Sequence, residues 1–493
     1  MAKSIIIIGA GIAGLAAGCY GQMNGYRTTI FELHDLPGGL CTSWNRRGYT
    51  FDGCIHWLVG SGPSNNFYRI WEELGAVQGS QMVNHEEFFR IEGKEGKTLI
   101  LYTDADRLAA HLKDLAPEDS KTIEELTEAI RQFAYMEVPI DAGLLNNVKM
   151  AGKMLPLLKY FKRYGKISIQ AFANRFQNSF LKESFASIFD IPDFPMIALL
   201  MTLGFQHRQA AGYPIGGSLQ FAKSVERRYL NLGGDIRYKA RVTQIITENN
   251  HAVGVRLADG TEYRADQIIS AADGHATIFD MLNSQYSNEE ILSNYRDLPI
   301  FQPIIQVSLG IGRDFSLEPH ALTFPLVEPL RIAGELHSKI SIKHYCYDPT
   351  MAPSGKSSLV ISFTSNYDYW QELGYGTQAY RTEKEDILTQ VVAVLERRFP
   401  GIKDQVEVAD VATPLTYERY TGNWQGSMEG WLITTSTLRK RIPNTLPGLK
   451  NFYMIGQWVQ PGGGLPPAAK SGRDIVKIIC KDDRRKFCTS IPV

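Results

Sequence analysis

A glycine-rich turn between an apolar strand and a helix constrains the fold of this chain more than any other feature. Residues 5–8 are four consecutive isoleucines, so they predict a central strand that is buried on both faces of a parallel sheet. The strand leads directly into a Gly-x-Gly-x-x-Gly turn, and a helix is expected to follow to about Asn24. This order of strand, turn and helix predicts an α/β domain with a Rossmann-like sheet that binds a dinucleotide.

Each position of the turn has an expected role. Gly9 permits the tight turn, Gly11 lets the backbone approach a pyrophosphate, and Gly14 lets the helix pack closely on the strand. Ile12 and Ala13 lie in the first helical turn, where free N–H groups and the helix dipole attract phosphate. These five residues are therefore predicted to bind the cofactor.

An acid at the end of the next predicted strand adds to this pattern. Residues 28–31 read as that strand, and Glu32 follows it, 18 residues after Gly14. A carboxylate at about this distance binds ribose hydroxyls and favours a free 2′-hydroxyl over a 2′-phosphate. Glu32 is therefore the predicted ribose ligand.

The segments that follow identify the cofactor through a family resemblance. Residues 37–43 read Pro-Gly-Gly-Leu-Cys-Thr-Ser, and residues 48–53 end in Phe-Asp-Gly. This block resembles the second FAD motif of the family that includes phytoene desaturases, carotenoid isomerases, retinol saturases and, more distantly, amine oxidases. The resemblance implies that FAD is bound by residues of this block, namely Gly38, Gly39, Leu40 and Thr42.

The same block leaves the reaction open. Most desaturases have arginine where this chain has Leu40, and the run Ile-His-Trp at 55–57 is closer to the retinol saturase pattern. Desaturation, saturation and cis/trans isomerisation use one scaffold, so the motifs do not choose among them.

Two later segments resemble the same family. Residues 211–217 carry a Tyr-Pro-x-Gly-Gly pattern before a helix, and a β-meander is expected from strands at 235–238, 242–247, 252–257 and 268–270. The resemblance implies that Val242 packs against adenine, although a strand valine is buried in most folds. Asp273, after the last of these strands, is expected to cap a helix rather than to bind a ligand.

The closing motif lies at residues 451–467. The resemblance implies that Gly456 and Gln457 meet the pyrophosphate and ribityl chain, and that the glycine loop up to Leu465 faces the flavin. The three FAD motifs divide the chain. Segments 1–81, 211–284 and 413–493 are predicted to form the FAD-binding domain, and segments 82–210 and 285–412 an inserted α+β substrate domain. That domain is expected to hold a mixed sheet under a helical lid, with helices at 119–133 and 385–398 and strands at 304–309 and 358–363.

Composition excludes several classes of function. The 52 basic and 52 acidic residues cancel, which argues against a nucleic-acid partner. The six cysteines form no Cys-x-x-Cys pair, so we expect no metal site and a reducing, cytoplasmic location. We expect no signal peptide and no membrane span. Only one dinucleotide turn is present, so we expect no NAD(P)H domain, and the electron partner is unknown.

Two segments of the predicted lid allow two interpretations each. Residues 146–169 hold six basic residues and no acid among apolar ones, which fits either peripheral contact with an anionic membrane or a solvated helix face. Residues 196–201 are apolar on all sides and fit either a core helix or the wall of a tunnel.

The most consistent function is that of an oxidoreductase with non-covalent FAD that acts on C–C or C=C bonds of an apolar isoprenoid, carotenoid-like or lipid substrate. His56 is the first candidate for proton transfer, although a buried structural histidine is the alternative. Trp57 and Tyr213 are expected to be walls of the site and are secondary catalytic candidates. A flavin amine oxidase and a non-catalytic prenyl-lipid escort protein are the alternative functions.

Overall fold

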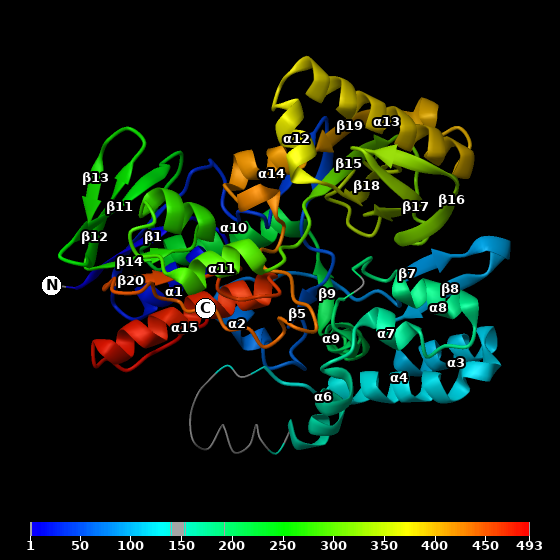
Figure 1. Ribbon diagram of the computed structural model, residues 1–493, viewed down its shortest axis with the longest axis horizontal. Coiled ribbons are helices and arrows are strands. Elements are labelled where there is room, and N and C mark those ends of the chain that lie inside the picture. Colours follow the sequence, from blue (N-terminus) through cyan, green and yellow to red (C-terminus); the bar gives the residue numbers. More distant parts are fainter. Residues whose placement is uncertain (1, 139, 141–151, 153, 192, 493) are drawn as a thin grey trace.

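Two sheets organise the molecule, and a group of helices lies against the second one. The computed structural model describes residues 2–138, 140, 152, 154–191 and 193–492. Figure 1 shows a parallel sheet with its helices on one side of the molecule and a larger mixed sheet on the other. The predicted fold class, a Rossmann-like domain with an α+β unit that holds a mixed sheet, is confirmed.

The parallel sheet contains the isoleucine strand near its centre. Ile6 pairs with Thr29 on one side and with Ile268 on the other, and the four isoleucines are at most 4% exposed. The strand order is β10 (Asp235–Arg237), β2 (Arg27–Phe31), β1 (Ser4–Ile8), β14 (Gln267–Ser270) and β20 (Phe452–Met454). Three distant parts of the chain therefore build one sheet.

Three helices pack on one face of this sheet, and glycines allow them to approach closely. The helices are α1 (Ile12–Met23), α10 (Gly217–Asn231) and α15 (Leu465–Asp482). A Cβ at Gly472 of α15 would lie 2.5 Å from the carbonyl oxygen of Ala13, and one at Gly18 would lie 2.6 Å from the ring of Tyr229. Neither position accepts a larger residue without moving a helix.

A three-stranded antiparallel sheet covers the opposite face, and its membership corrects the predicted meander. It consists of β11 (Val242–Glu248), β12 (His251–Leu257) and β13 (Glu262–Arg264). The predicted strands at 235–238 and 268–270 belong instead to the parallel sheet, as β10 and β14. Strand β13 was missed because it is short, polar and on an edge, whereas β14 is apolar and lies between two parallel neighbours.

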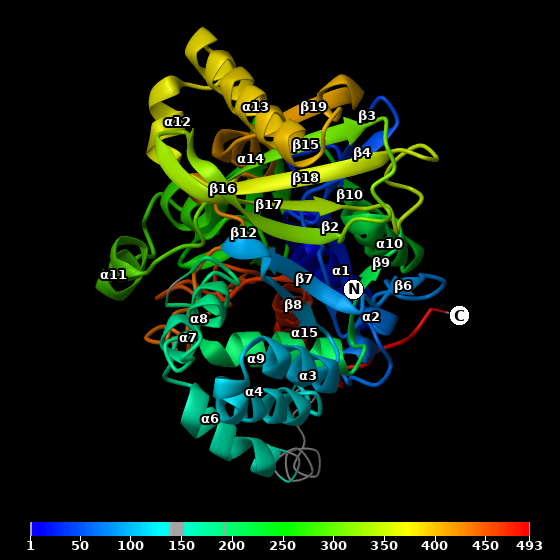
Figure 2. The ribbon, with the colours of Figure 1, turned by 90° about the vertical axis from the view of Figure 1, so that its right-hand side faces the viewer.

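The mixed sheet has one apolar and one polar face. Its strand order is β19 (Val406–Ala412), β15 (Ile304–Ile311), β18 (Ser357–Thr364), β17 (Glu335–His344), β16 (Ala321–Ile332), β7 (Glu87–Glu92) and β8 (Thr98–Tyr102). Alternate residues such as Val307 and Ile361 form a core with helix α13 (Gln378–Arg398), which lies above the sheet in Figure 2. The intervening residues Gln306, Ser362 and Thr364 face the other way, into a cavity.

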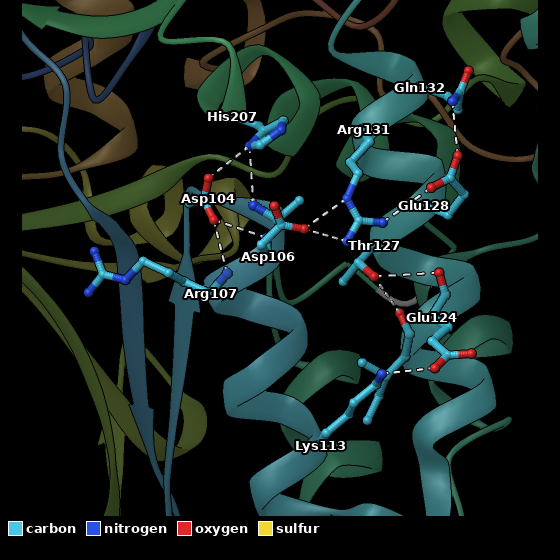
Figure 3. A network of polar contacts seen from close by, with 12 residues as sticks. Asp104, Asp106, Arg107, Lys113, Glu124, Thr127, Glu128, Arg131, Gln132 and His207 are labelled. Carbon is cyan, nitrogen blue, oxygen red and sulfur yellow. Dashed lines mark hydrogen bonds and ion pairs between the residues drawn. The ribbon is translucent and has the colours of Figure 1, made fainter.

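A group of helices packs against β7 and β8 of the mixed sheet, on the side away from α13 (Figure 2). They are α3 (Ala105–Leu115), α4 (Ser120–Phe133), α6 (Leu158–Tyr164), α7 (Ile169–Ala173), α8 (Ser179–Ala186) and α9 (Met196–His207). Figure 3 shows how polar contacts join α3 to α4. Arg131 contacts Asp106 at 2.6 Å, Lys113 contacts Glu124 at 2.8 Å, and Asp104 caps α3 through the amides at its start. Since these pairs are largely exposed, apolar packing carries most of the stability of this layer.

Shorter elements connect these layers. They are β3 (Ser43–Arg46), β4 (Tyr49–Asp52), β5 (Leu58–Val59), α2 (Tyr68–Glu73), β6 (Met82–Val83), β9 (Ala211–Pro214), the π-helical turn η4 (Ala276–Met281), α11 (Glu289–Asp297), α12 (Tyr367–Leu373), α14 (Pro414–Thr421), and the 3-10 turns η1 (Lys94–Gly96), η2 (Pro117–Asp119), η3 (Leu155–Leu157), η5 (Lys403–Gln405) and η6 (Trp424–Gly426). Within the described residues, no helix combines the length and apolarity needed to span a bilayer.

Candidate active site

One long cavity of about 1670 Å³ runs between the two sheets and the helices. At one end it is lined by the glycine turn after β1, and at the other by apolar side chains of α9 and α6. The polar face of β15 and β18 lies along it. The described residues contain no cluster of three or more side chains suited to hold a metal.

The glycine turn forms the first end of the cavity. Gly9, Gly11, Ile12 and Ala13 line it. A Cβ at Gly11 would have only the carbonyl oxygen of Gly38 within 4 Å, at 3.9 Å, so the space beside this residue is open. Gly14 lies behind the wall, where a Cβ would lie 2.0 Å from the carbonyl oxygen of Gly9. Gly11 thus leaves space beside its backbone, whereas Gly14 allows close packing of α1 on its own turn.

Glu32 projects into the cavity from the end of β2. One carboxylate oxygen accepts the Ala10 N–H at 2.7 Å and the other accepts the His34 N–H at 2.8 Å. Burial raises the pKa of Glu32, and the two backbone hydrogen bonds oppose this shift. A carboxylate oxygen has a second lone pair, so each oxygen can still accept a ribose hydroxyl.

The second motif contributes three of its four predicted residues to the wall. Gly38, Gly39 and Leu40 line the cavity, whereas Thr42 does not. The backbone of Thr42 turns away because its carbonyl oxygen accepts the Gly53 N–H at 3.0 Å. Thr42 therefore joins the two halves of the motif and does not reach the groove.

Asp52 of the same motif fixes the segment that follows it. Its carboxylate accepts the backbone N–H of Ser218, at the start of α10, at 2.7 Å and the backbone N–H of Cys54 at 2.9 Å. Gln306 of β15 donates to the Asp52 carbonyl oxygen at 3.0 Å. These bonds hold the chain just before His56 against α10 and the mixed sheet.

The closing motif and the meander complete the groove. Gly456, Gln457, Leu465 and Val242 all line the cavity. A Cβ at Gly456 would lie 3.5 Å from the side chain of Ala13, which is ordinary contact. The first glycine turn and the closing motif therefore lie next to each other in the cavity wall.

This groove fits a dinucleotide. The first turn of α1 has amide groups without partners inside the helix, and the open space beside Gly11 lies next to them. Glu32 marks one end of the groove and the glycine loop before Leu465 marks the other. The residues predicted to bind the two ends of FAD are thus brought to one wall.

His56 and Trp57, which follow the second motif, also line the cavity. The imidazole of His56 is exposed to the cavity and has no hydrogen-bond partner among the described residues. Burial within the protein, helped by the charge of Lys343, lowers the pKa of His56 well below its usual value. The imidazole is therefore neutral at physiological pH.

Tyr213 lies outside this site, which corrects its predicted placement. Its side chain is fully buried and its hydroxyl contacts Asp348 at 3.2 Å, and it does not line the cavity. The ring packs instead against Tyr345 and Tyr347. Strand β9 pairs with both β5 and β6, and this pairing directs the ring away from the cavity.

Helix α9 combines both interpretations of the apolar run at 196–201. Met196, Leu199 and Leu200 are fully buried in the helical core. Ile197 and Met201 line the cavity. The helix is thus core on one side and cavity wall on the other.

Glu429 is a cavity residue that the sequence analysis missed. It lies beside Gly463 of the closing motif, and burial raises its pKa to about 7. It belongs to no spaced motif, and its only signal in the sequence is a single acid between Met428 and Trp431. Asp273 also lines the cavity, and burial raises its pKa to about 7, but backbone amides of Ala276 and Trp424 hold its carboxylate.

Comparison with known proteins gives a family and a set of relatives. Residues 12–480 match the family model described as flavin containing amine oxidoreductase. The prolycopene isomerase of Daucus carota is 26% identical over 95% of this chain and 78% of its own length. The lycopene-forming phytoene desaturase of Pseudescherichia vulneris is 23% identical over 97% of this chain and 99% of its own.

Solved structures show the same fold at lower identity. An oxidoreductase from Methanosarcina mazei superposes with a TM-score of 0.64 and 17% identity, covering 96% of this chain and all of that one. The cyclohexylamine oxidase of Brevibacterium oxydans superposes with a TM-score of 0.59 and 13% identity, covering 98% of this chain and all of that one.

Proposed function

The chain belongs to the flavin-containing amine oxidoreductase family, and on that basis we propose that it acts on C–C or C=C bonds of a long apolar substrate. The substrate class is an isoprenoid, carotenoid-like or other lipid molecule. The names of the relatives, a prolycopene isomerase and phytoene desaturases, support this class.

The observation that carries the proposal is the continuity of the cavity. A groove that fits a dinucleotide opens without a break into a chamber walled by Phe161, Phe194, Ile197, Met201 and Phe205. An extended apolar molecule in this chamber removes carbon surface from water at about 25 cal/mol per Å². Its chain then lies next to the flavin end of the groove.

In this proposal the cofactor is FAD, held by the glycine turn, Glu32 and the closing motif. The FAD-binding domain consists of segments 1–81, 211–284 and 413–493. The substrate chamber is formed by segments 82–210 and 285–412. A bound flavin provides two-electron chemistry that side chains cannot provide. The protein contributes orientation of the substrate, exclusion of water and movement of protons.

The FAD is proposed to be bound without a covalent link. Cys41 is one of two cavity cysteines, and it is 1% exposed, with its thiol directed to the Ser218 carbonyl oxygen. Burial raises the pKa of the Cys41 thiol, so the nucleophilic thiolate is disfavoured. Acid denaturation should therefore release the flavin into solution.

The lid segment is proposed to touch a membrane surface. Leu155 and Leu158 are 66% and 55% exposed, while Phe161 of the same segment lines the cavity. Lys159 and Lys162 are exposed beside them. Residues 146–151 and 153 of the basic stretch lie outside the described residues, and the proposal rests on the part from 154 onward. An apolar substrate could pass from lipid to the chamber along this helix.

The test combines a spectrum with a substrate screen. Purified protein should show flavin absorbance, and apolar polyenes and isoprenoids should be desaturated, saturated or isomerised when they are added under matched redox conditions. Oxidation of amines without any change in alkenes would establish the amine oxidase alternative. A colourless protein that binds prenyl lipids would establish the escort alternative.

A further inference from the structure

Glu429 differs from its neighbours because its carboxyl group has no partner. It lies in the cavity wall, and no described residue forms a hydrogen bond or ion pair with it. A Cβ built on Gly463 would lie 2.5 Å from the Cβ of Glu429. The side chain therefore starts directly beside the glycine loop that closes the cofactor groove.

The backbone on both sides of this residue is held in place. The Ser427 hydroxyl donates to the Phe301 carbonyl oxygen at 3.0 Å, and the Phe301 N–H donates to the Gly430 carbonyl oxygen at 2.8 Å. The Trp431 carbonyl oxygen accepts the Gly462 N–H at 3.0 Å. The short segment that carries Glu429 is thus bonded to Phe301, just before β15, and to Gly462 of the closing motif. These bonds fix the position of the Glu429 backbone.

Four other acids of the cavity wall are occupied, and Asp280, which has no such partner in the described part of the chain, is exposed to solvent. Glu32 and Asp273 each accept two backbone amides. Asp190 pairs with a lysine at 2.9 Å, and Asp193 accepts a threonine hydroxyl at 2.9 Å. Holding an unpartnered carboxyl group in an apolar site opposes stability, so Glu429 is not explained as a structural residue.

Its surroundings also set its chemistry. Met428, Leu432 and Ile433 line the cavity next to Glu429, and burial is the sole cause of its raised pKa of about 7. Such a group is both protonated and ionised in comparable amounts at neutral pH, which suits an acid–base catalyst. Neutral His56, whose pKa is low, suits that task less well.

We propose that Glu429 is the catalytic residue that moves a proton at the reacting carbon of the substrate, a role that rests on the proposed function. In the oxidative direction, two C–H bonds on adjacent carbons break and a C=C bond forms. One hydrogen leaves with its electron pair to the flavin, and the other leaves as a proton to the Glu429 carboxylate. Reduction of a C=C bond reverses both transfers, and the protonated carboxyl group supplies the proton.

The test compares Glu429→Gln with Glu372→Gln, which makes the same chemical change at an exposed position of α12. Glu429→Gln should bind flavin normally and lower turnover by about 10²- to 10⁴-fold, the usual contribution of one acid–base group. Glu372→Gln should match the parent protein in both flavin binding and turnover. Glu429→Asp should recover part of the loss, because it restores a carboxyl group on a shorter side chain.

Infrared spectroscopy gives a readout that does not depend on turnover. The parent protein should show carboxylic acid C=O absorbance from Glu429 and Asp273 that fades as pH rises through about 7, and Glu429→Gln should lose the Glu429 part of it, which a parent-minus-variant difference spectrum isolates. An unchanged band, or unchanged turnover and pH profile, in Glu429→Gln would overturn the inference while leaving the proposed function intact. Failure of the parent protein to act on any alkene would overturn the proposed function and, with it, the catalytic role of Glu429.

Discussion

A methyl group added at Gly11 should affect FAD binding, whereas one added at Gly14 should affect the stability of the fold. At Gly11 the methyl group enters open space, whereas at Gly14 it would lie 2.0 Å from the Gly9 carbonyl oxygen. Gly11→Ala should keep the free energy of unfolding within about 1 kcal/mol of the parent and weaken FAD binding at least about tenfold. Gly14→Ala should destabilise the fold by about 1–3 kcal/mol.

Thermal unfolding of the flavin-free proteins and titration with FAD separate the two effects. A Gly11→Ala protein that binds FAD as tightly as the parent would show that the pyrophosphate does not pass this residue. Equal melting temperatures for Gly14→Ala and the parent would show that the tight contact at this position relaxes without cost.

The unpartnered carboxyl group also makes stability depend on pH. The folded-state pKa of Glu429 is about 7, above the ordinary value of 4.5, so the folded protein binds this proton more tightly than the unfolded chain. The contribution is fully present below about pH 4.5 and is lost as pH rises through 7. Over that range the parent should lose up to about 3 kcal/mol relative to Glu429→Gln. Urea unfolding of both proteins at pH 5 and pH 8 measures this difference, and parallel pH dependence in the two would contradict it.

His56 should affect rate without setting the pH profile. Since its imidazole is neutral near pH 7 and faces the cavity, His56→Ala should leave FAD bound and slow turnover, while the inflection assigned to Glu429 stays in place. Steady-state kinetics between pH 6 and pH 8 measures both quantities. Unchanged turnover would remove His56 from the mechanism, and a lost inflection would transfer the titrating role to it.

Single residues were predictable where a motif fixes their place in the chain. Gly9, Gly11 and Glu32 reach the cavity wall because strand, turn and helix position them locally. Tyr213 and Thr42 depart from their predicted places because strand pairing and a backbone bond to Gly53 turn them away. Glu429 could not be predicted, since contacts far apart in the sequence, such as that with Gly463, bring it to the site.

At the scale of elements, the lid segment formed by η3 and α6 presents apolar side chains both to solvent and to the cavity. Replacing Leu155 and Leu158 by serine should reduce flotation with liposomes that contain anionic lipid, because both side chains are exposed. Leu317→Ser is the matched control, since Leu317 is fully exposed elsewhere on the molecule. Equal flotation of the double variant and the parent, or no flotation of the parent, would contradict the membrane proposal.

Long apolar elements were easier to predict than short polar ones. The strands at 304–309 and 358–363 and the helices at 119–133 and 385–398 all appear, with extended or shifted ends, because their periodic apolar residues pack into cores. Strand β13 has no such pattern and exists through pairing with β12. The two ends of the predicted meander were misplaced because local alternation does not reveal which sheet a strand joins.

For the whole molecule, the cavity bears on how electrons arrive. The described residues contain one strand–glycine–helix turn of the dinucleotide type, and it lines the FAD groove. NADPH at micromolar concentration should therefore fail to bleach the flavin, whereas dithionite should reduce it. Anaerobic absorbance spectra measure both. Rapid, saturable bleaching by NADPH would show that a nicotinamide reaches the flavin by another route.

The parallel sheet has a consequence for biosynthesis. Its central strand lies at residues 4–8, but its edge strand at 452–454 and the helix that follows emerge from the ribosome long after it. A nascent chain thus carries the glycine turn long before the wall that closes the groove exists. Capture of the cofactor should accordingly be a post-translational event, and the open sheet edge at β14 should be the part of the young polypeptide that most needs protection by chaperones.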